Sequence, residues 1–255
     1  MLYWVTGSTG QLGSAIVEEL KSKNLSVMAS SDVDVTNDRD IEKFMSLNRP
    51  DVVINCAAFT DVDGAELDVR NWQVNAYAPY LLSRFCISHQ AKLIHISTDY
   101  IYDDLKRKIP VNEYGRAKLL GECAVLEWLG SMIIRVSTLC SVDKGLVRSF
   151  VNLKKSGRQI TIDPKVSVSP TSVYLLAKEI CALPLSDYSV RGIFEYNAGS
   201  VSLEELVSYL GVSNYSLGRP ERLAKRINKP CIVMDRRFTA STWQEHVDDI
   251  VKRLK

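Results

Sequence analysis

Short apolar runs and amphipathic stretches alternate along the first 140 residues of the chain. Runs such as LYWVT and DVVINCAA are apolar on both faces, which is typical of buried strands in a parallel sheet covered by helices. Between the runs, apolar residues recur every four positions, as at Leu12, Ile16 and Leu20, which predicts helices. The predicted strands are 2–6, 25–30, 51–58, 92–98 and 131–138, and the predicted helices are 11–23, 38–47, 68–90 and 114–129.

This alternation of strand and helix predicts an α/β fold, a Rossmann-like doubly wound parallel sheet. The second half of the chain is less regular. Its expected strands are 157–163 and 192–199, and its expected helices are 171–182, 202–210 and 241–254. We therefore divide the chain into a Rossmann-like domain, residues 1–138, and a smaller, interleaved C-terminal part, residues 139–255, some segments of which return to the first domain.

Composition and charge narrow the classes of function. A net charge of +2 gives no strong field to attract nucleic acid or an anionic membrane. No apolar run approaches the roughly 20 residues that span a bilayer, and the N-terminal MLYWVTG does not resemble a signal peptide. The six cysteines form no C-x-x-C pair, which argues against a zinc site or a disulfide framework. We expect a cytoplasmic protein with no nucleic acid, membrane or metal partner.

Three glycines, Gly7, Gly10 and Gly13, lie between the first predicted strand and the first predicted helix. In that setting one glycine permits a tight turn, one lets backbone approach a pyrophosphate, and one lets the helix pack closely on its strand. The N–H groups at the start of the helix can then hold phosphate charge. A tight turn without a ligand is the alternative interpretation. The setting favours an NAD(P)-binding domain.

Two further features carry candidate chemistry. The stretch EYGRAKLLGE contains Tyr114 and Lys118, which share one face of a helix because they are four residues apart. We expect the Lys118 ammonium to lie near the phenol and to lower its pKa, so that Tyr114 can exchange protons near neutral pH. The second feature is HISTDYIYDD, where Ser97 or Thr98 ends a predicted strand and offers a hydroxyl to a substrate carbonyl.

The order of these features resembles the extended branch of the short-chain dehydrogenase/reductase superfamily. NCAAFTDVDGAE, HISTDYIYD, NEYGRAKLLGE and VSPTSVYLLAKEI resemble the dTDP-4-dehydrorhamnose reductase family in particular. The resemblance implies reduction by NADPH or NADH of the C4 keto group of a nucleotide-linked 6-deoxyhexose. It implies Thr98 as the catalytic hydroxyl, Tyr114 as the proton donor and Lys118 as the lysine that binds the cofactor ribose. A nucleotide-diphosphate sugar is the implied partner, and a homodimer the implied assembly.

The resemblance also implies the cofactor contacts. The residues it assigns to them are Gly7, Thr9, Gly10, Gln11, Leu12 and Gly13 at the pyrophosphate, Asp34 and Val35 at the adenine, Cys56, Ala57, Ala58 and Thr60 beside the ribose and pyrophosphate, and Asn75, Tyr114 and Lys118. After the second strand, Ser30 and Ser31 precede Asp32. Small hydroxyls there leave room for a 2′-phosphate, so we expect NADPH rather than NADH.

Three departures from the family's pattern affect the sugar pocket. Tyr114 follows Thr98 by only 16 positions, where the family has a longer loop. Thr138 and Cys140 stand where the family has an aromatic pair, and Lys229 replaces an arginine. Two alternatives therefore stay open. One is a reductase or epimerase of a related sugar nucleotide, and the other is a non-catalytic NADP-binding regulatory subunit, such as the β subunit of methionine adenosyltransferase.

Overall fold

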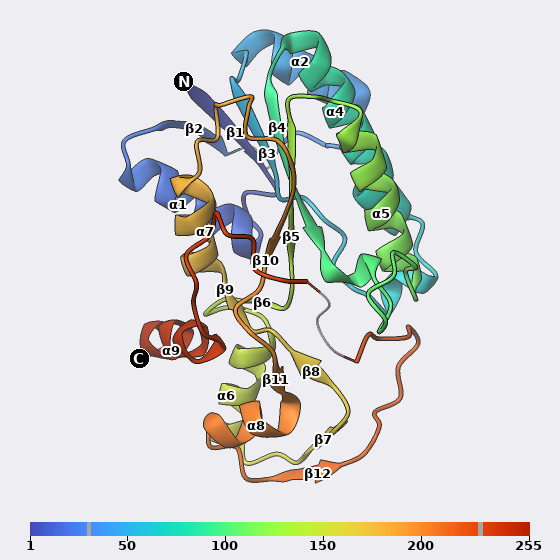
Figure 1. Ribbon diagram of the computed structural model, residues 1–255, viewed down its shortest axis with the longest axis vertical. Helices are drawn as coiled ribbons and strands as arrows, with labels where there is room; N and C mark the ends of the chain where they lie inside the picture. The colour runs from blue at the N-terminus through green and yellow to red at the C-terminus, as the bar shows by residue number, and fades with distance from the viewer. Residues whose placement is uncertain (30–31, 229–231) are drawn as a thin grey trace.

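Six parallel strands form the central sheet, in the order β2-β1-β3-β4-β5-β10 (Figure 1). Their bounds are Leu2–Thr6 (β1), Ser26–Ala29 (β2), Val52–Asn55 (β3), Lys92–Thr98 (β4), Ser131–Val136 (β5) and Gly192–Tyr196 (β10). Every residue of β3, β4 and β5 is buried, as expected of strands covered on both faces. The predicted Rossmann-like parallel sheet is therefore confirmed.

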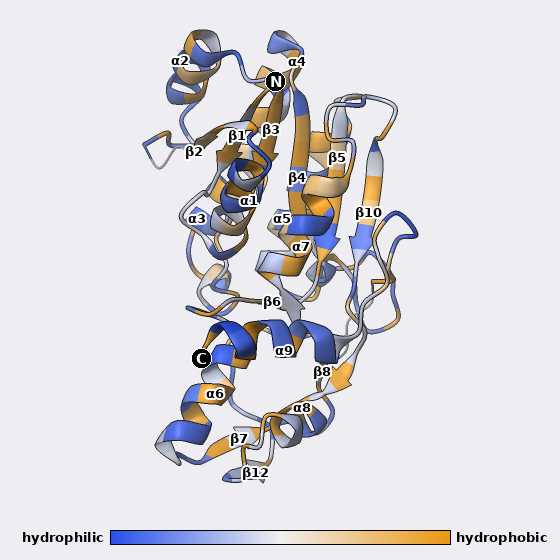
Figure 2. Ribbon diagram, turned by 90° about the vertical axis from the view of Figure 1, so that its left-hand side faces the viewer, coloured by the Kyte–Doolittle hydropathy of each residue, from blue (hydrophilic) through white to orange (hydrophobic). Residues whose placement is uncertain are grey.

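Helices cover both faces of the sheet (Figures 1 and 2). Helices α1 (Gln11–Ser22) and α7 (Val173–Ala182) pack on the face that buries alternate strand residues such as Ile54. The other face buries their neighbours, such as Val53, under α2, α4 and α5. These three helices are Asp38–Asn48 (α2), Ala78–His89 (α4) and Glu113–Leu126 (α5). The alternation of side chains along each strand thus supplies one apolar layer on each face of the sheet.

The predicted helix over 68–90 is divided into pieces. A short α3 (Arg70–Trp72) leads into a π-helical turn, Gln73–Tyr77, and then into α4. Pro79 explains the interruption, because proline has no N–H to donate four residues back. The third predicted strand, 51–58, is also shorter than expected and ends at Asn55.

The rest of the chain builds a second core from the helices α6 (Leu146–Ser156), α8 (Leu203–Tyr209) and α9 (Trp243–Arg253). The sequence analysis did not predict α6. Short strands complete this part: Leu139–Cys140 (β6), Ile160–Ile162 (β7), Ser167–Val168 (β8), Thr171–Ser172 (β9), Val201–Ser202 (β11) and Tyr215–Leu217 (β12). Helix α7 and strand β10 lie within residues 139–255 but belong spatially to the central sheet.

The computed structural model describes residues 1–29, 32–228 and 232–255. The predictions made for Ser30 and Ser31 at the 2′-phosphate and for Lys229, as well as the cysteine Cys231, lie outside this part of the chain. Within it, none of the helices has the length and apolar character needed to cross a membrane.

Candidate active site

The glycine loop follows β1 and contacts the chain that leaves β3, at the point where the order of the strands reverses. Gly7 has a φ of +60°, and a Cβ atom there would lie 2.6 Å from the backbone nitrogen of Ala57. A Cβ atom on Gly13 would lie 2.2 Å from the carbonyl oxygen of Gly7. Both positions therefore require glycine. In open α/β sheets this reversal point, at the carboxyl ends of the strands, is where ligands bind.

The start of α1 fits the phosphate groups of a dinucleotide. Gly10 is the N-cap and offers no side-chain hydrogen bond, and the first turn of α1 holds no acidic residue. The first N–H groups of the helix are therefore available to an anion, and the helix dipole favours negative charge there. The buried Oε1 atom of Gln11 has no hydrogen-bond partner within the described part of the chain. This polar atom needs a partner, which a bound ligand would supply.

The other residues expected at the cofactor are placed in different ways. Asn75 is fully buried, and its amide bonds the backbone N–H and carbonyl of Phe59 at 3.1 and 2.9 Å, so it holds the loop that follows β3. Asp34 accepts hydrogen bonds from the N–H and hydroxyl of Thr36 and so closes its own turn. Of the rest, Thr9 and Thr60 are exposed, Val35, Cys56, Ala57 and Ala58 are half-buried, and Leu12 is buried. Their contacts with a cofactor stay predictions.

Thr98 and Tyr114 meet at the carboxyl end of β4. Thr98 is the last residue of the strand and accepts a hydrogen bond from the N–H of Tyr100 at 3.2 Å. Tyr114, in the first turn of α5, lies close to Thr98, whose side chain acts to lower its pKa, and the Tyr114 ring lies edge-on to that of Tyr100 at 5.7 Å. Burial raises the pKa of Tyr114 above its ordinary value. The phenol therefore keeps its proton at neutral pH.

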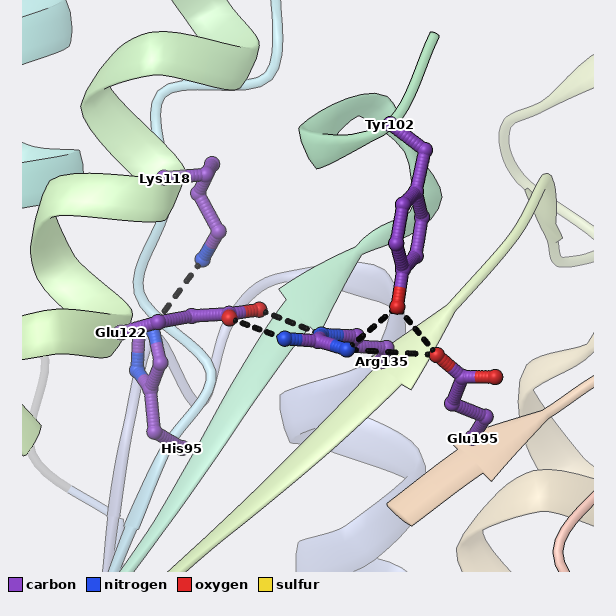
Figure 3. Close-up of polar contacts among 6 residues, drawn as sticks. All are labelled: His95, Tyr102, Lys118, Glu122, Arg135 and Glu195. Atoms are coloured by element: carbon purple, nitrogen blue, oxygen red, sulfur yellow. Dashed lines mark hydrogen bonds and ion pairs between the residues drawn. The ribbon is translucent and has the colours of Figure 1, made fainter. Parts of the chain in front are cut away.

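Lys118 does not face the phenol as expected. Its Nζ atom donates to the carbonyl oxygen of Ile96 at 2.6 Å and lies 3.3 Å from Nε2 of His95, inside the sheet (Figure 3). Burial lowers the pKa of Lys118 to about 8. The groups that act on the pKa of Tyr114 are Thr98, Asp99 and Tyr100. The prediction that Lys118 lowers the pKa of Tyr114 is therefore wrong for this arrangement of the chain.

Sequence reasoning did not identify Asp99, which follows Thr98 directly. Its side chain is 3% exposed, and burial raises its pKa to about 6, while hydrogen bonds with Ser137 and Thr98 act against this shift. An ionised Asp99 raises the pKa of Tyr114 further. Asp99 thus helps Tyr114 to keep its proton. A carboxyl group next to the candidate hydroxyl was the signal in the sequence.

Two acidic residues of the TDVDGAE stretch hold the site together, another role that sequence reasoning missed. Asp63 accepts hydrogen bonds of 2.8 Å from the N–H of Ala224 and from Nη2 of Arg226. Glu66 accepts a hydrogen bond of 3.0 Å from the N–H of Glu113, the first residue of α5. The stretch therefore connects a C-terminal segment and the helix of Tyr114 to the loop after β3.

A buried ionic network lies behind the site (Figure 3). Arg135, on β5, bonds both carboxylate oxygens of Glu122 at 2.9 and 2.7 Å, and it also bonds the Tyr102 hydroxyl and Glu195. Arg135 and Glu122 are 3% and 1% exposed. Two N–H groups facing two oxygens give such a pair a fixed geometry. The network links α5 to β5 and β10, and a single arginine inside the apolar run SMIIRVST was its sequence signal.

The shortened loop before Tyr114 is well bonded. Asp103 pairs with Arg107 at 2.6 Å, and Asp104 accepts two hydrogen bonds from Asn228. Where the family's aromatic pair is absent, Thr138 accepts a hydrogen bond from the N–H of Thr171, and Cys140 is buried in the second core. The shortened loop and the positions of the missing aromatic pair are thus held by hydrogen bonds and packing within the described residues.

Comparison with known proteins agrees with this geometry. Residues 1–202 match the model of the family described as the RmlD substrate binding domain. A dTDP-4-dehydrorhamnose reductase from Mycobacterium tuberculosis is 35% identical over 220 residues, which cover 78% of this chain and 70% of that protein.

Solved structures extend the similarity over the whole chain. The dTDP-4-dehydrorhamnose reductase from Clostridium acetobutylicum has a TM-score of 0.89 at 27% identity and covers 100% of this chain and 99% of its own. The enzyme of the same name from Bacillus anthracis, solved in complex with NADP, has a TM-score of 0.88 at 25% identity and covers 99% of each chain. The fold and the family that the sequence resembles are therefore both confirmed.

Proposed function

The chain belongs to the RmlD substrate binding domain family, and on that premise we propose that it reduces the C4 keto group of a dTDP-linked 6-deoxyhexose with NADPH. It is an NADPH-dependent oxidoreductase that acts on a sugar nucleotide. The observation that carries this proposal is the pairing of Thr98 with a protonated Tyr114 at the end of β4. A proton donor beside a second hydroxyl is what the reduction of a ketone requires.

In the proposed reaction, bound NADPH supplies the hydride. Tyr114 gives its proton to the sugar oxygen as charge develops there. Thr98 hydrogen-bonds the same oxygen and stabilises the developing charge. The uncapped start of α1 and the glycine loop bind phosphate groups of the cofactor. Asp99 keeps Tyr114 protonated until the substrate is in place.

Lys118 has two tasks in this proposal. It binds the ribose hydroxyls of the cofactor, and its ammonium stabilises the Tyr114 phenolate that is left after proton transfer. Both tasks require the Nζ atom to leave the Ile96 carbonyl and turn toward the phenol. Lys118 is four residues after Tyr114 on α5, so a change of side-chain rotamer suffices for this movement.

Replacement of Tyr114 by Phe tests the proposal. Oxidation of NADPH is followed by absorbance with dTDP- and UDP-linked 4-keto-6-deoxyhexoses. We expect the wild-type protein to turn over one of them and Tyr114→Phe to lower kcat by about 10²–10⁴-fold, because the proton donor is lost. Tyr209→Phe is the matched control, since its hydroxyl bonds only Asp248 on the far part of the molecule among the described residues.

Two results would contradict the proposal. One is cofactor binding without oxidation of NADPH by any of the sugars, which would favour the non-catalytic regulatory subunit. The other is a Tyr114→Phe protein with wild-type kcat. Interconversion of two sugar nucleotides without net oxidation of NADPH would favour an epimerase.

The proposal includes two properties of the whole protein. One is the cytoplasm as its compartment, which is consistent with five free cysteines, Cys56, Cys86, Cys123, Cys140 and Cys181, in the described part of the chain. The other is a homodimer, as the family resemblance implies. Sedimentation of the purified protein would measure the second property directly.

A further inference from the structure

A row of buried, hydrogen-bonded polar side chains runs from β1 to Lys118 across three strands. The Thr6 hydroxyl donates to Oδ1 of Asn55 at 2.7 Å, and Nδ2 of Asn55 lies 3.0 Å from Nδ1 of His95. Nε2 of His95 then lies 3.3 Å from Nζ of Lys118 (Figure 3). Thr6, Asn55, His95 and Lys118 are each no more than 2% exposed. Each polar hydrogen atom of these four side chains therefore needs an acceptor within the protein.

The backbone sets the direction of these hydrogen bonds. The N–H of Ala57 can only donate, and it lies 3.2 Å from Oδ1 of Asn55, so Oδ1 is the acceptor. Nδ2 is then the amide atom that contacts His95, and an amide nitrogen can only donate a hydrogen bond. Nδ1 of His95 must accept, and it therefore carries no hydrogen. A neutral imidazole has one hydrogen, so this hydrogen lies on Nε2 and faces Lys118.

Lys118 must accept the hydrogen bond from His95. Only an uncharged amine has the lone pair to do so, since an ammonium has three donors and no acceptor. The uncharged amine can still donate to the Ile96 carbonyl oxygen at 2.6 Å. Both hydrogen bonds of Nζ within the described part of the chain are then made in the right direction.

The charged groups around Lys118 permit this state. From its own helix, Glu122 faces it, but both carboxylate oxygens of Glu122 are bonded to Arg135 of β5. After β3, Cys56 faces it as a neutral thiol, because burial raises the pKa of Cys56 to about 12. His95, from β4, is held neutral by burial, which lowers its pKa. Burial lowers the pKa of Lys118 itself, to about 8.

We propose that His95 is a positioning residue that, fixed as its Nε2–H tautomer by Asn55, holds Lys118 in alkaline solution as an uncharged amine facing away from Tyr114 until a cofactor binds. In alkaline solution, binding of the dinucleotide then releases Lys118 and is accompanied by uptake of one proton, which makes the ammonium that the phenolate needs. This inference rests on the proposed role of Lys118 at the cofactor ribose. The proton that Lys118 takes up when the cofactor binds gives it the positive charge that later stabilises the Tyr114 phenolate.

The tautomer of His95 is tested in the free protein by long-range ¹H–¹⁵N NMR of the histidine rings. The chain has three histidines, and His95→Gln identifies the signals of His95. Near pH 9 we expect the shifts of the Nε2–H form in the wild type. In Asn55→Asp the new carboxylate accepts from Nδ1, so we expect the Nδ1–H form. A wild-type His95 with its hydrogen on Nδ1 overturns the inference, whether or not the variant folds.

Proton uptake is tested by calorimetric titration with NADP⁺, without sugar, in buffers of different ionisation enthalpy. In the wild type we expect uptake of about one proton per chain near pH 9 and almost none near pH 6.5, where Lys118 is already charged. Asn55→Asp and His95→Leu both remove the N–H that faces Lys118, and both should reduce the uptake near pH 9 to nearly zero. Of these two variants, only Asn55→Asp adds a charge.

The outcomes separate this inference from the proposed function. Equal uptake in the wild type and in His95→Leu overturns the inference, because an effect in Asn55→Asp alone is an effect of its charge. Binding with the expected uptake but no turnover of any sugar overturns the proposed substrate and leaves the positioning role supported. Failure to bind NADP⁺ overturns the proposed function, and the NMR measurement then decides the tautomer.

Discussion

The side chains of the site differ in protonation because each has different neighbours. Burial keeps the proton on Tyr114 and lowers the pKa of Lys118 to about 8, whereas it raises the pKa of Asp99 to about 6. The sequence alone could single out Thr98, Tyr114 and Lys118 as the side chains that carry the candidate chemistry. Their charges could not, because desolvation depends on the strands and helices that surround a group and not on its neighbours in the chain.

The closest backbone approach at the site gives a sharp prediction at the scale of one residue. Gly13→Ala places a Cβ atom 2.2 Å from the carbonyl oxygen of Gly7, so α1 must move away from β1. We expect a loss of about 3 kcal/mol in the free energy of unfolding, measured in urea. Binding of NADPH should weaken by about tenfold or more, measured by fluorescence titration, because the start of α1 is displaced.

Gly10→Ala is the matched control in the same loop. Its Cβ atom would lie 3.1 Å from the same oxygen, and the φ of −78° suits alanine. We expect a loss of about 1 kcal/mol or less. Similar losses in the two variants would mean that the close packing of α1 on β1 does not set the shape of the loop.

Among the elements, the first turn of α5 is held from three sides. The side chain of Asn112 caps the helix by accepting from the N–H of Gly115 at 2.8 Å, and it also donates to the carbonyl oxygen of Lys225. Glu66 accepts a hydrogen bond from the N–H of Glu113, and Asn71 donates one to the carbonyl oxygen of Glu113. These bonds fix the turn that carries Tyr114. The position of the phenol therefore depends on caps and loops and not only on the helix itself.

Removal of the cap should thus affect stability and catalysis together. We expect Asn112→Ala to cost about 1 kcal/mol in unfolding free energy and to lower kcat by about tenfold, because Tyr114 loses its alignment. Asn37 caps α2 in the same way by accepting from the N–H of Arg39, and α2 contributes no residue to the site. Asn37→Ala should show a similar loss in urea unfolding with an unchanged kcat, and a parallel fall in its kcat would contradict this account.

The sequence predicted long elements better than short ones. The strands and helices of the first 140 residues follow their hydrophobic period, whereas α6 was missed although Val147 and Phe150 bury one face of it. The third strand ends at Asn55 because the chain then passes the glycine loop, where Ala57 meets Gly7. Two-residue strands such as β6 and β9 are defined only by the hydrogen bonds between them, so no local sequence pattern predicts them.

In the whole molecule, His246 connects the C-terminal helix to the rest of the fold. Nδ1 of His246 accepts from the N–H of Ser172 at 2.9 Å, and Nε2 lies 2.8 Å from the Ser241 hydroxyl and 3.2 Å from that of Tyr196. The ring joins α9 to β9 and β10. Burial lowers the pKa of His246 to about 4, so the folded protein holds this ring neutral.

This histidine should make the protein less stable in acid. The folded pKa of about 4 lies below the ordinary value of 6.5, so the unfolded chain binds more protons between these values. The stabilisation is complete above pH 6.5 and is lost as the pH falls toward 4, by about 3 kcal/mol. Urea unfolding as a function of pH measures it, and His246→Gln should show a shallower dependence.

The return of the C-terminal half to the sheet has a consequence for synthesis of the chain. Strand β5 ends at Val136, but its neighbour β10 begins only at Gly192. At ordinary rates of translation, the ribosome needs about 3–11 s to make the intervening stretch. During that time the nascent chain exposes an unpaired apolar strand edge, which other chains can join. Slower translation beyond residue 136 should therefore increase aggregation of the newly made protein.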